Sequence, residues 1–151
     1  MSEKEIRVLF KRKGFVINDY HKENGCLVIV VLKDYSEGFN IDFNGKIKLL
    51  VKIDKRFLKY KNNQIFKPAF YEISNLIPKN VQNHFYPDGS ICYAPPERPL
   101  YEKWQLLDYI EAVDAMINDW FNKEYLGASK LRGLEHGEKG KIQYSYLKNK
   151  L

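Results

Sequence analysis

A histidine and a cysteine lie eight positions apart in the segment His84–Cys92, and Pro87-Asp88-Gly89 lies between them. Proline presets its φ angle, aspartate can close a turn with its side chain, and glycine adopts a positive φ without steric cost. The three residues therefore predict a tight turn. Residues 90–92 follow as a very short extended piece, which ends before prolines 95, 96 and 99. We expect the thiol on a proline-framed surface segment, because reactive groups tend to lie on loops held by a rigid scaffold.

Length and composition indicate one globular domain. The chain has 151 residues, of which 44% are hydrophobic and 15% aromatic, enough to bury a sizeable core. No run approaches the roughly 18 apolar residues that a membrane span requires. The start of the sequence is charged and lacks the apolar stretch of a secretory signal. We therefore expect a cytoplasmic protein without membrane association.

Neither the cysteines nor the charges indicate a cofactor. Cys26 and Cys92 match no zinc pattern and the three histidines are scattered, so we expect neither a metal nor another cofactor. Cys26 is interpreted as an inert core or edge thiol. The net charge is +6, but no nucleic-acid-binding motif is present. A solvated surface of mixed charge is the preferred interpretation, and nucleic acid is not an expected partner.

The first half of the chain predicts a helix followed by strands. Residues 3–13 have helical spacing, with Ser2 as N-cap and Gly14 at the end. Strand character follows at 15–17, at 26–32, which we expect to be buried on both faces, at 39–43 and at 46–53. Asn44-Gly45 predicts a hairpin turn between the last two strands.

The second half predicts a proline-interrupted edge strand, a loop and a long helix. The strand is expected within residues 65–73, the loop over 75–83 and the helix over 101–123, where apolar residues recur at the helical period. Residues 126–151 are expected to form a loop-rich C-terminal extension, whose end is compatible with a short closing element or a frayed end. A helix, an antiparallel meander and a second helix make an α+β fold.

This order of elements resembles the ubiquitin-conjugating enzyme fold. In that family a His-Pro-Asn motif precedes a Gly-x-Ile/Leu-Cys motif, and His84, Gly89, Ile91 and Cys92 match its residues in order. The Asp88–Cys92 stretch is similar to the one carried by divergent bacterial members, several of which belong to CBASS-like anti-phage operons. The resemblance implies one domain over residues 1–151, with an N-terminal helix, an antiparallel four-stranded meander, an active-site loop and a long C-terminal helix.

The resemblance also implies a reaction. Cys92 would carry an acyl group as a thioester and transfer it to an amine or thiol acceptor. His84 is interpreted as a buttress that fixes the loop, ahead of a general base. Asp88 is first a turn former, with deprotonation of the acceptor amine as a second role. The family's oxyanion-stabilising asparagine is absent, since Phe85 and Tyr86 follow the histidine; the Tyr86 hydroxyl, if not simply packed, and the adjacent Asn83 are the candidate substitutes.

The implied partners are proteins. The donor would be the C-terminus of a ubiquitin-like protein or of a cyclic-nucleotide synthase, charged by a separate activating enzyme, and the acceptor would be a protein. Two alternatives stay open. One is a non-catalytic binding module of the same fold. The other is a cysteine peptidase with Cys92 and His136 as a dyad, although Cys92 does not start a helix, where the dipole lowers a peptidase thiol's pKa.

Overall fold

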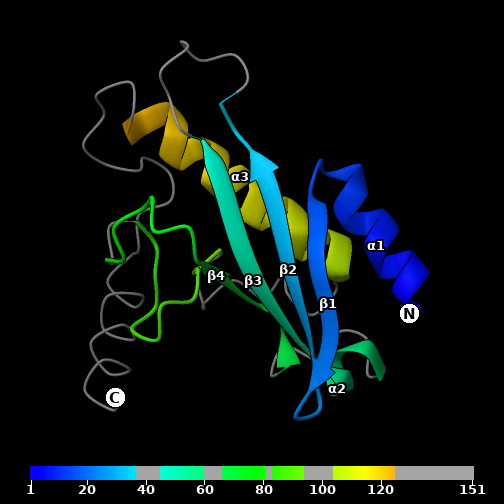
Figure 1. Cartoon of the computed structure of the whole chain (residues 1–151). Coiled ribbons are helices and arrows are strands. Elements are labelled where there is room, and N and C mark those ends of the chain that lie inside the picture. The colour runs from blue at the N-terminus through cyan, green and yellow to red at the C-terminus, as the bar shows by residue number, and fades with distance from the viewer. Residues whose placement is uncertain (37–44, 60–65, 81–82, 94–103, 125–151) are drawn as a thin grey trace.

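The computed structural model describes residues 1–36, 45–59, 66–80, 83–93 and 104–124. They form an α+β structure in which a four-stranded antiparallel sheet has the strand order β1-β2-β3-β4. The elements in chain order are α1 (Glu3–Arg12), β1 (Val16–Glu23), β2 (Cys26–Asp34), β3 (Lys46–Asp54), α2 (Lys55–Lys59), β4 (Ala69–Glu72) and α3 (Leu106–Glu124). Figure 1 shows α3 crossing one face of the sheet and α1 beside β1.

Helix α1 forms as the sequence predicts. The Ser2 hydroxyl accepts a hydrogen bond from the Glu5 backbone N–H at 3.1 Å, which satisfies one of the donors that a helix start leaves open. Gly14 ends the helix with φ +82°, a conformation that glycine adopts readily. Ile6 and Phe10 are buried on the face turned to the core.

The central strands alternate between a buried face and a partly open one. Leu27, Ile29 and Val31 of β2 are buried, and so are the odd-numbered apolar residues of β3. On the other face of β2, Val28 is buried but Val30 and Leu32 are only half-buried, so the expectation of burial on both faces holds at Val28 and is wrong further along the strand. Such alternation is typical of an antiparallel sheet that has one face on the core.

One strand prediction needs correction. Strand β1 is longer than residues 15–17, because Asn24 (φ +50°) and Gly25 (φ +77°) make a two-residue turn that pairs β1 with β2, with one irregularity between Ile17 and Asp19. The polar side chains of residues 18–23 hide this strand in the sequence. The strand predicted at 46–53 is confirmed as β3, which pairs with β2 along its whole length and also with β4. Residues 39–44 themselves lie outside the described residues.

The later elements are of the predicted type, but their boundaries differ from the predicted ones. The edge strand β4 is confirmed, but it starts only after Pro68, since proline cannot donate to a sheet ladder. The long helix is confirmed and starts at Leu106 rather than 101. Helix α2 was not predicted, because five residues are too few to show a helical period. The extension predicted for 126–151 lies outside the described residues.

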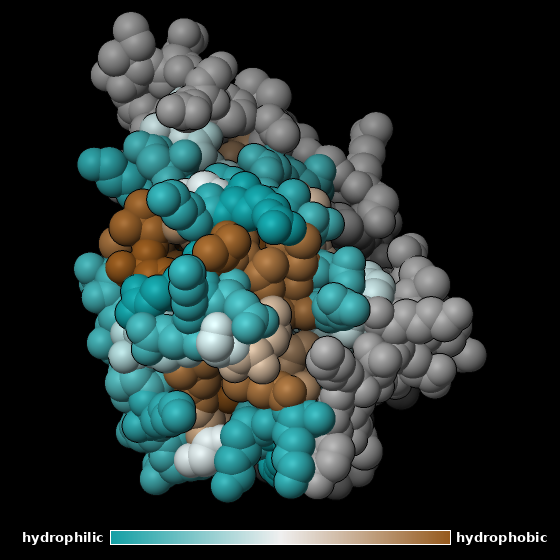
Figure 2. Space-filling view, turned by 90° about the vertical axis from the view of Figure 1, so that its right-hand side faces the viewer, coloured by the Kyte–Doolittle hydropathy of each residue, from teal (hydrophilic) through white to brown (hydrophobic). Residues whose placement is uncertain are grey.

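Helix α3 supplies one side of the hydrophobic core. Its side chains at Val113, Ile117, Trp120 and Phe121 are all buried, and they belong to a cluster that also contains the inward residues of the sheet and of α1. Figure 2 shows the side of α1 and β1, where apolar surface lies between hydrophilic side chains. Within the described ranges, no helix has the length and apolar character to cross a membrane.

Candidate functional site

The predicted Pro-Asp-Gly turn is present and closes a small hairpin. The Gly89 N–H donates to the Tyr86 carbonyl at 2.9 Å, and the Tyr86 N–H donates to the Ser90 carbonyl at 2.8 Å. Asp88 Oδ1 accepts from the Ser90 N–H at 2.9 Å and from its hydroxyl at 2.6 Å. Gly89 has φ +87°, which this three-residue type of hairpin loop requires of its last residue. Each of the three turn residues therefore does what its type predicts.

The hairpin places His84 and Cys92 opposite one another. Phe85 pairs with Ile91, and one step further from the turn the Cys92 N–H donates to the His84 carbonyl at 2.7 Å. His84 has φ +61°, a left-handed conformation that is uncommon for residues other than glycine and is found at constrained sites. Two residues that are eight positions apart in sequence are thus joined backbone to backbone.

The hairpin is fixed between β4 and α3. On one side, the Ile91 N–H donates to the Phe70 carbonyl at 2.8 Å. On the other side, the Phe85 ring stacks on Trp120 with ring centroids 5.1 Å apart. The Trp120 indole N–H donates to the Asn83 carbonyl at 3.0 Å. A rigid frame of this kind holds functional side chains more precisely than a free loop does.

The thiol of Cys92 is buried, contrary to the expected surface position. Only 1% of the residue is exposed, and His84 is exposed by 3%. The chain turns inward at this point, since the Tyr93 ring packs edge-on against Phe70 and Tyr109 and its hydroxyl donates to the Pro68 carbonyl at 2.8 Å. A segment that looks like a proline-framed surface loop in sequence is therefore part of the packed interior.

Lys67 lies beside the hairpin and was not recognised in the sequence. Its Nζ atom is 5.7 Å from the ring centroids of both Tyr86 and Tyr93, within the range of cation–π attraction. Burial lowers the pKa of Lys67 below its ordinary value, while the charge of the Cys92 sulfur acts in the opposite direction. No spacing rule connects this residue to Cys92, and it is one of 25 lysines and arginines.

The remaining predicted residues differ in what surrounds them. Asp88 is exposed, and one of its carboxylate oxygens accepts the hydrogen bond from the Ser90 N–H that closes the turn. Tyr86 is half-buried next to Lys67. The Asn83 side chain donates to the Pro78 carbonyl at 2.9 Å and so belongs to the preceding loop. His136 lies outside the described residues.

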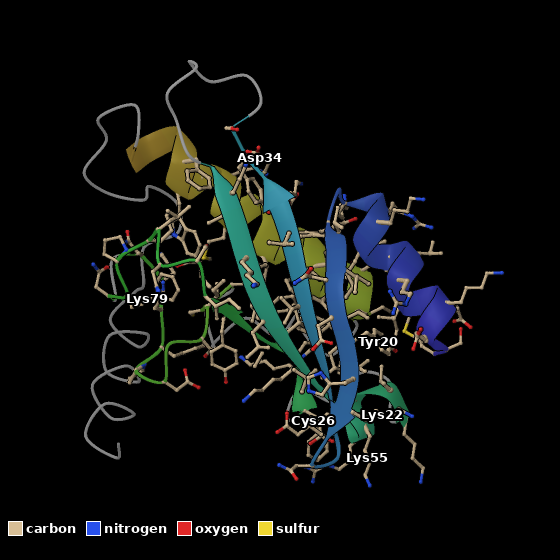
Figure 3. All side chains as sticks on the ribbon, in the orientation of Figure 1. Tyr20, Lys22, Cys26, Asp34, Lys55 and Lys79 are labelled. Atoms are coloured by element: carbon tan, nitrogen blue, oxygen red, sulfur yellow. The ribbon has the colours of Figure 1, made fainter. Side chains whose placement is uncertain are left out.

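A buried ion pair ties the preceding loop to β4. The Glu72 side chain is fully buried and accepts hydrogen bonds from Lys79 Nζ and from the Ser74 hydroxyl. Burial alone would raise the pKa of Glu72, but these bonds outweigh it, and the pKa of the carboxyl lies below its ordinary value. Lys79 Nζ also lies 4.9 Å from the Phe85 ring centroid, so the pair reaches the hairpin. Figure 3 labels Lys79 on this side of the molecule.

Comparisons of the chain with protein-family models, with curated proteins and with solved structures find no match. Within the part of the chain that the structure describes, no group of three or more histidine, cysteine, aspartate or glutamate side chains is arranged to hold a metal ion. The hairpin and its surroundings carry side chains of three chemical kinds. These are a thiol, an imidazole on the opposite arm of the hairpin, and an ammonium group close enough to interact with the sulfur. A cation beside a cysteine favours the thiolate, which is the nucleophilic form.

Proposed function

We propose that the protein is a ubiquitin-conjugating-like acyltransferase that carries an acyl group as a thioester on Cys92. The observation that carries this proposal is the hairpin, because it fixes Cys92 against His84 and beside the ammonium of Lys67. The α+β order of helix, antiparallel meander and helix supports it as well. Thioester exchange is nearly balanced in energy, so a thiol supported by one cation is sufficient for the first step.

The reaction consists of two transfers. In the first, the Cys92 sulfur attacks the carbonyl carbon of a donor thioester, a new S–C bond forms, and the donor thiol leaves with a proton. In the second, an amine of the acceptor attacks, the C–N bond forms, and Cys92 recovers its proton as the S–C bond breaks. The carbonyl oxygen becomes negative in each step, and one well-placed donor there contributes about 3 kcal/mol.

The side chains around Cys92 have different roles in these two transfers. Lys67 supplies positive charge near the sulfur, in a site where the family's asparagine is missing. His84 acts as the buttress, through its backbone bond to Cys92. Asp88 keeps the turn closed, and the Tyr86 hydroxyl is the second candidate donor. Burial strengthens the interaction between Lys67 and the Cys92 sulfur, because little water screens it.

The partners and setting follow from the same proposal. The acyl donor is the C-terminus of a ubiquitin-like protein or of a cyclic-nucleotide synthase, loaded by a separate activating enzyme. The acceptor is a protein, and the setting is anti-phage defence in the cytoplasm. Because Cys92 is only 1% exposed, the proposal requires that donor engagement opens access to the thiol.

The same burial favours a second candidate, a binding module of this fold without activity. A cysteine at 1% exposure has the surroundings of a structural thiol, and buried thiols are commonly inert. The peptidase alternative gains no support from the described residues, since Cys92 lies in the hairpin and not at the start of a helix, and His136 lies outside them. One experiment separates the conjugating enzyme from the binding module.

That experiment is the intact mass of the protein, without reductant, after co-expression with the products of its neighbouring genes. We expect a thiol-labile adduct on the wild type that disappears in Cys92→Ala and persists in Cys92→Ser as a more stable ester. Cys26→Ala is the matched control and should keep the adduct. An adduct that survives Cys92→Ala would contradict the assignment, and no adduct with any combination of neighbours would favour the binding module.

A further inference from the structure

A second site lies at the opposite edge of the sheet from the hairpin. A groove of about 540 Å³ is bounded by the start of α1, the β1–β2 turn and α2. It is next to β1, whereas the hairpin pairs with β4 at the other edge. The described residues that line it include Tyr20, Lys22, Cys26, Lys55, Leu58 and Lys59.

The floor of the groove is apolar and its rim is hydrophilic. Tyr20 and Leu58, which are half-buried, give the floor its accessible apolar surface, and the buried side chains of Ile6 and Leu27 lie beneath it. Figure 2 shows this pattern in the lower half of the view, where apolar surface is framed by hydrophilic side chains. A volume of this size falls within the range of roughly 300–1,000 Å³ that is typical of small-molecule pockets.

The rim carries an excess of positive charge. Lys22 comes from β1, and Lys55 and Lys59 come from α2, and all three side chains are exposed. Among the described lining residues the single carboxylate is that of Glu3, which lies 3.0 Å from Arg7 Nε and is thereby balanced. Figure 3 shows Lys22 and Lys55 at the same end of the sheet as Cys26. An apolar floor beneath ammonium groups suits a ligand with the opposite charge and an apolar part.

We propose that this groove binds a small organic anion with an apolar body, of the class of medium-chain carboxylates. The apolar chain would cover Tyr20 and Leu58, and the carboxylate would lie among the lysine ammonium groups at the rim. Cys26 is half-buried in the wall and is a free thiol, so it reports on occupancy without being required for binding. This site is independent of the chemistry at Cys92.

The test measures the rate at which iodoacetamide labels Cys26, followed by peptide mass mapping of the full-length protein. We expect decanoate, kept below its micelle concentration, to slow labelling of Cys26 at least fivefold. Acetate, which lacks the apolar body, and decylamine, which has the opposite charge, should leave the rate unchanged. Labelling of Cys92 in the same sample should not respond.

Charge-reversal variants give the matched comparison. The double variant Lys55→Glu/Lys59→Glu should lose protection by decanoate, whereas Lys11→Glu/Lys46→Glu, with the same change of charge at exposed positions outside the groove, should keep it. Circular dichroism would confirm that both variants are folded. Equal protection by decylamine, or protection that persists in Lys55→Glu/Lys59→Glu, would overturn the proposal. Slow labelling of Cys26 in the ligand-free protein would do so too, since it would show that the chain itself fills the groove.

Discussion

At the scale of single residues, Lys67 is the side chain that distinguishes the hairpin from an ordinary packed turn. A buried ammonium group is costly, and the lowered pKa of Lys67 expresses that cost. The two tyrosine rings and the nearby sulfur offset part of it. If the Cys92 sulfur is the charged partner of Lys67, then removing the Lys67 ammonium must make the Cys92 thiolate harder to form.

This predicts opposite behaviour of two variants at position 67. In Lys67→Met the thiolate of Cys92 loses a nearby positive charge, and its alkylation at pH 7 should slow by about 3- to 10-fold. Lys67→Arg keeps the charge and should remain close to the wild type. The alkylation rate of Cys92, measured between pH 6 and pH 10, would give the midpoint of its ionisation. This midpoint should be displaced upward in Lys67→Met alone. Labelling of Cys26 in the same molecules is the internal control, and the same midpoint at Cys92 in all three proteins would contradict the role of Lys67.

Gly89 gives a second residue-scale prediction. Its φ of +87° is disfavoured for any side chain, although a Cβ atom there would meet nothing within 4 Å. Gly89→Ala should therefore destabilise the fold by about 1–2 kcal/mol through backbone strain alone. Gly89→Asn should cost less, because asparagine tolerates left-handed conformations. Urea unfolding would measure both, and a neutral Gly89→Ala would show that the turn opens easily.

At the scale of elements, the ion pair between Glu72 and Lys79 links the edge strand β4 to the hairpin. The Glu72 side chain is fully buried and Lys79 is 31% exposed, so the pair is screened less than a surface pair. Replacing Glu72 with glutamine keeps the shape and removes the charge. We expect Glu72→Gln to lower the free energy of unfolding at pH 7 by about 1–3 kcal/mol.

The pH dependence of this effect has a definite sign. Because the folded-state pKa of Glu72 lies below its ordinary value of 4.5, the carboxylate stabilises the fold fully above that value. The contribution is lost as the pH falls through the lower folded-state pKa. The difference in stability between wild type and Glu72→Gln should therefore be largest near neutral pH and shrink below about pH 4.5. A difference that stays constant down to pH 3 would show that the charge of Glu72 is not involved.

The elements also show which features sequence patterns can predict and which they cannot. The Pro87–Gly89 turn and the Ser2 cap were predictable, because each is decided by residues within three positions of one another. The polar strand β1 was underestimated because its stability comes from pairing with β2. Lys67 and Glu72 were missed, because their importance depends on partners that the fold brings from elsewhere.

At the scale of the whole molecule, a cluster around Asp114 joins three parts of the fold. Asp114 Oδ1, on α3, accepts hydrogen bonds from Lys33 Nζ and from the Tyr35 hydroxyl, both at 2.7 Å. Lys33 Nζ also donates to the Lys13 carbonyl at the end of α1, again at 2.7 Å. Burial raises the pKa of Tyr35, and the Asp114 charge adds to this, so the phenol remains a donor at all physiological pH values.

The chain offers a matched pair of variants on α3 that tests this arrangement. Asp114 and Lys33 side chains are 16% and 22% exposed, whereas the nearby pair of Glu111 and Lys13, at 3.2 Å, is 45% and 31% exposed. Asp114→Ala leaves a partly buried ammonium and a phenol without their acceptor, so it should cost about 2–4 kcal/mol of unfolding free energy. Glu111→Ala removes a pair that water already screens and should cost about 0–1 kcal/mol. Denaturant unfolding of both variants would measure the two losses of unfolding free energy. Equal losses in that smaller range would mean that α3 is held to the sheet by its apolar face alone, since Asp114 differs from Glu111 both in its burial and in accepting a second hydrogen bond from Tyr35.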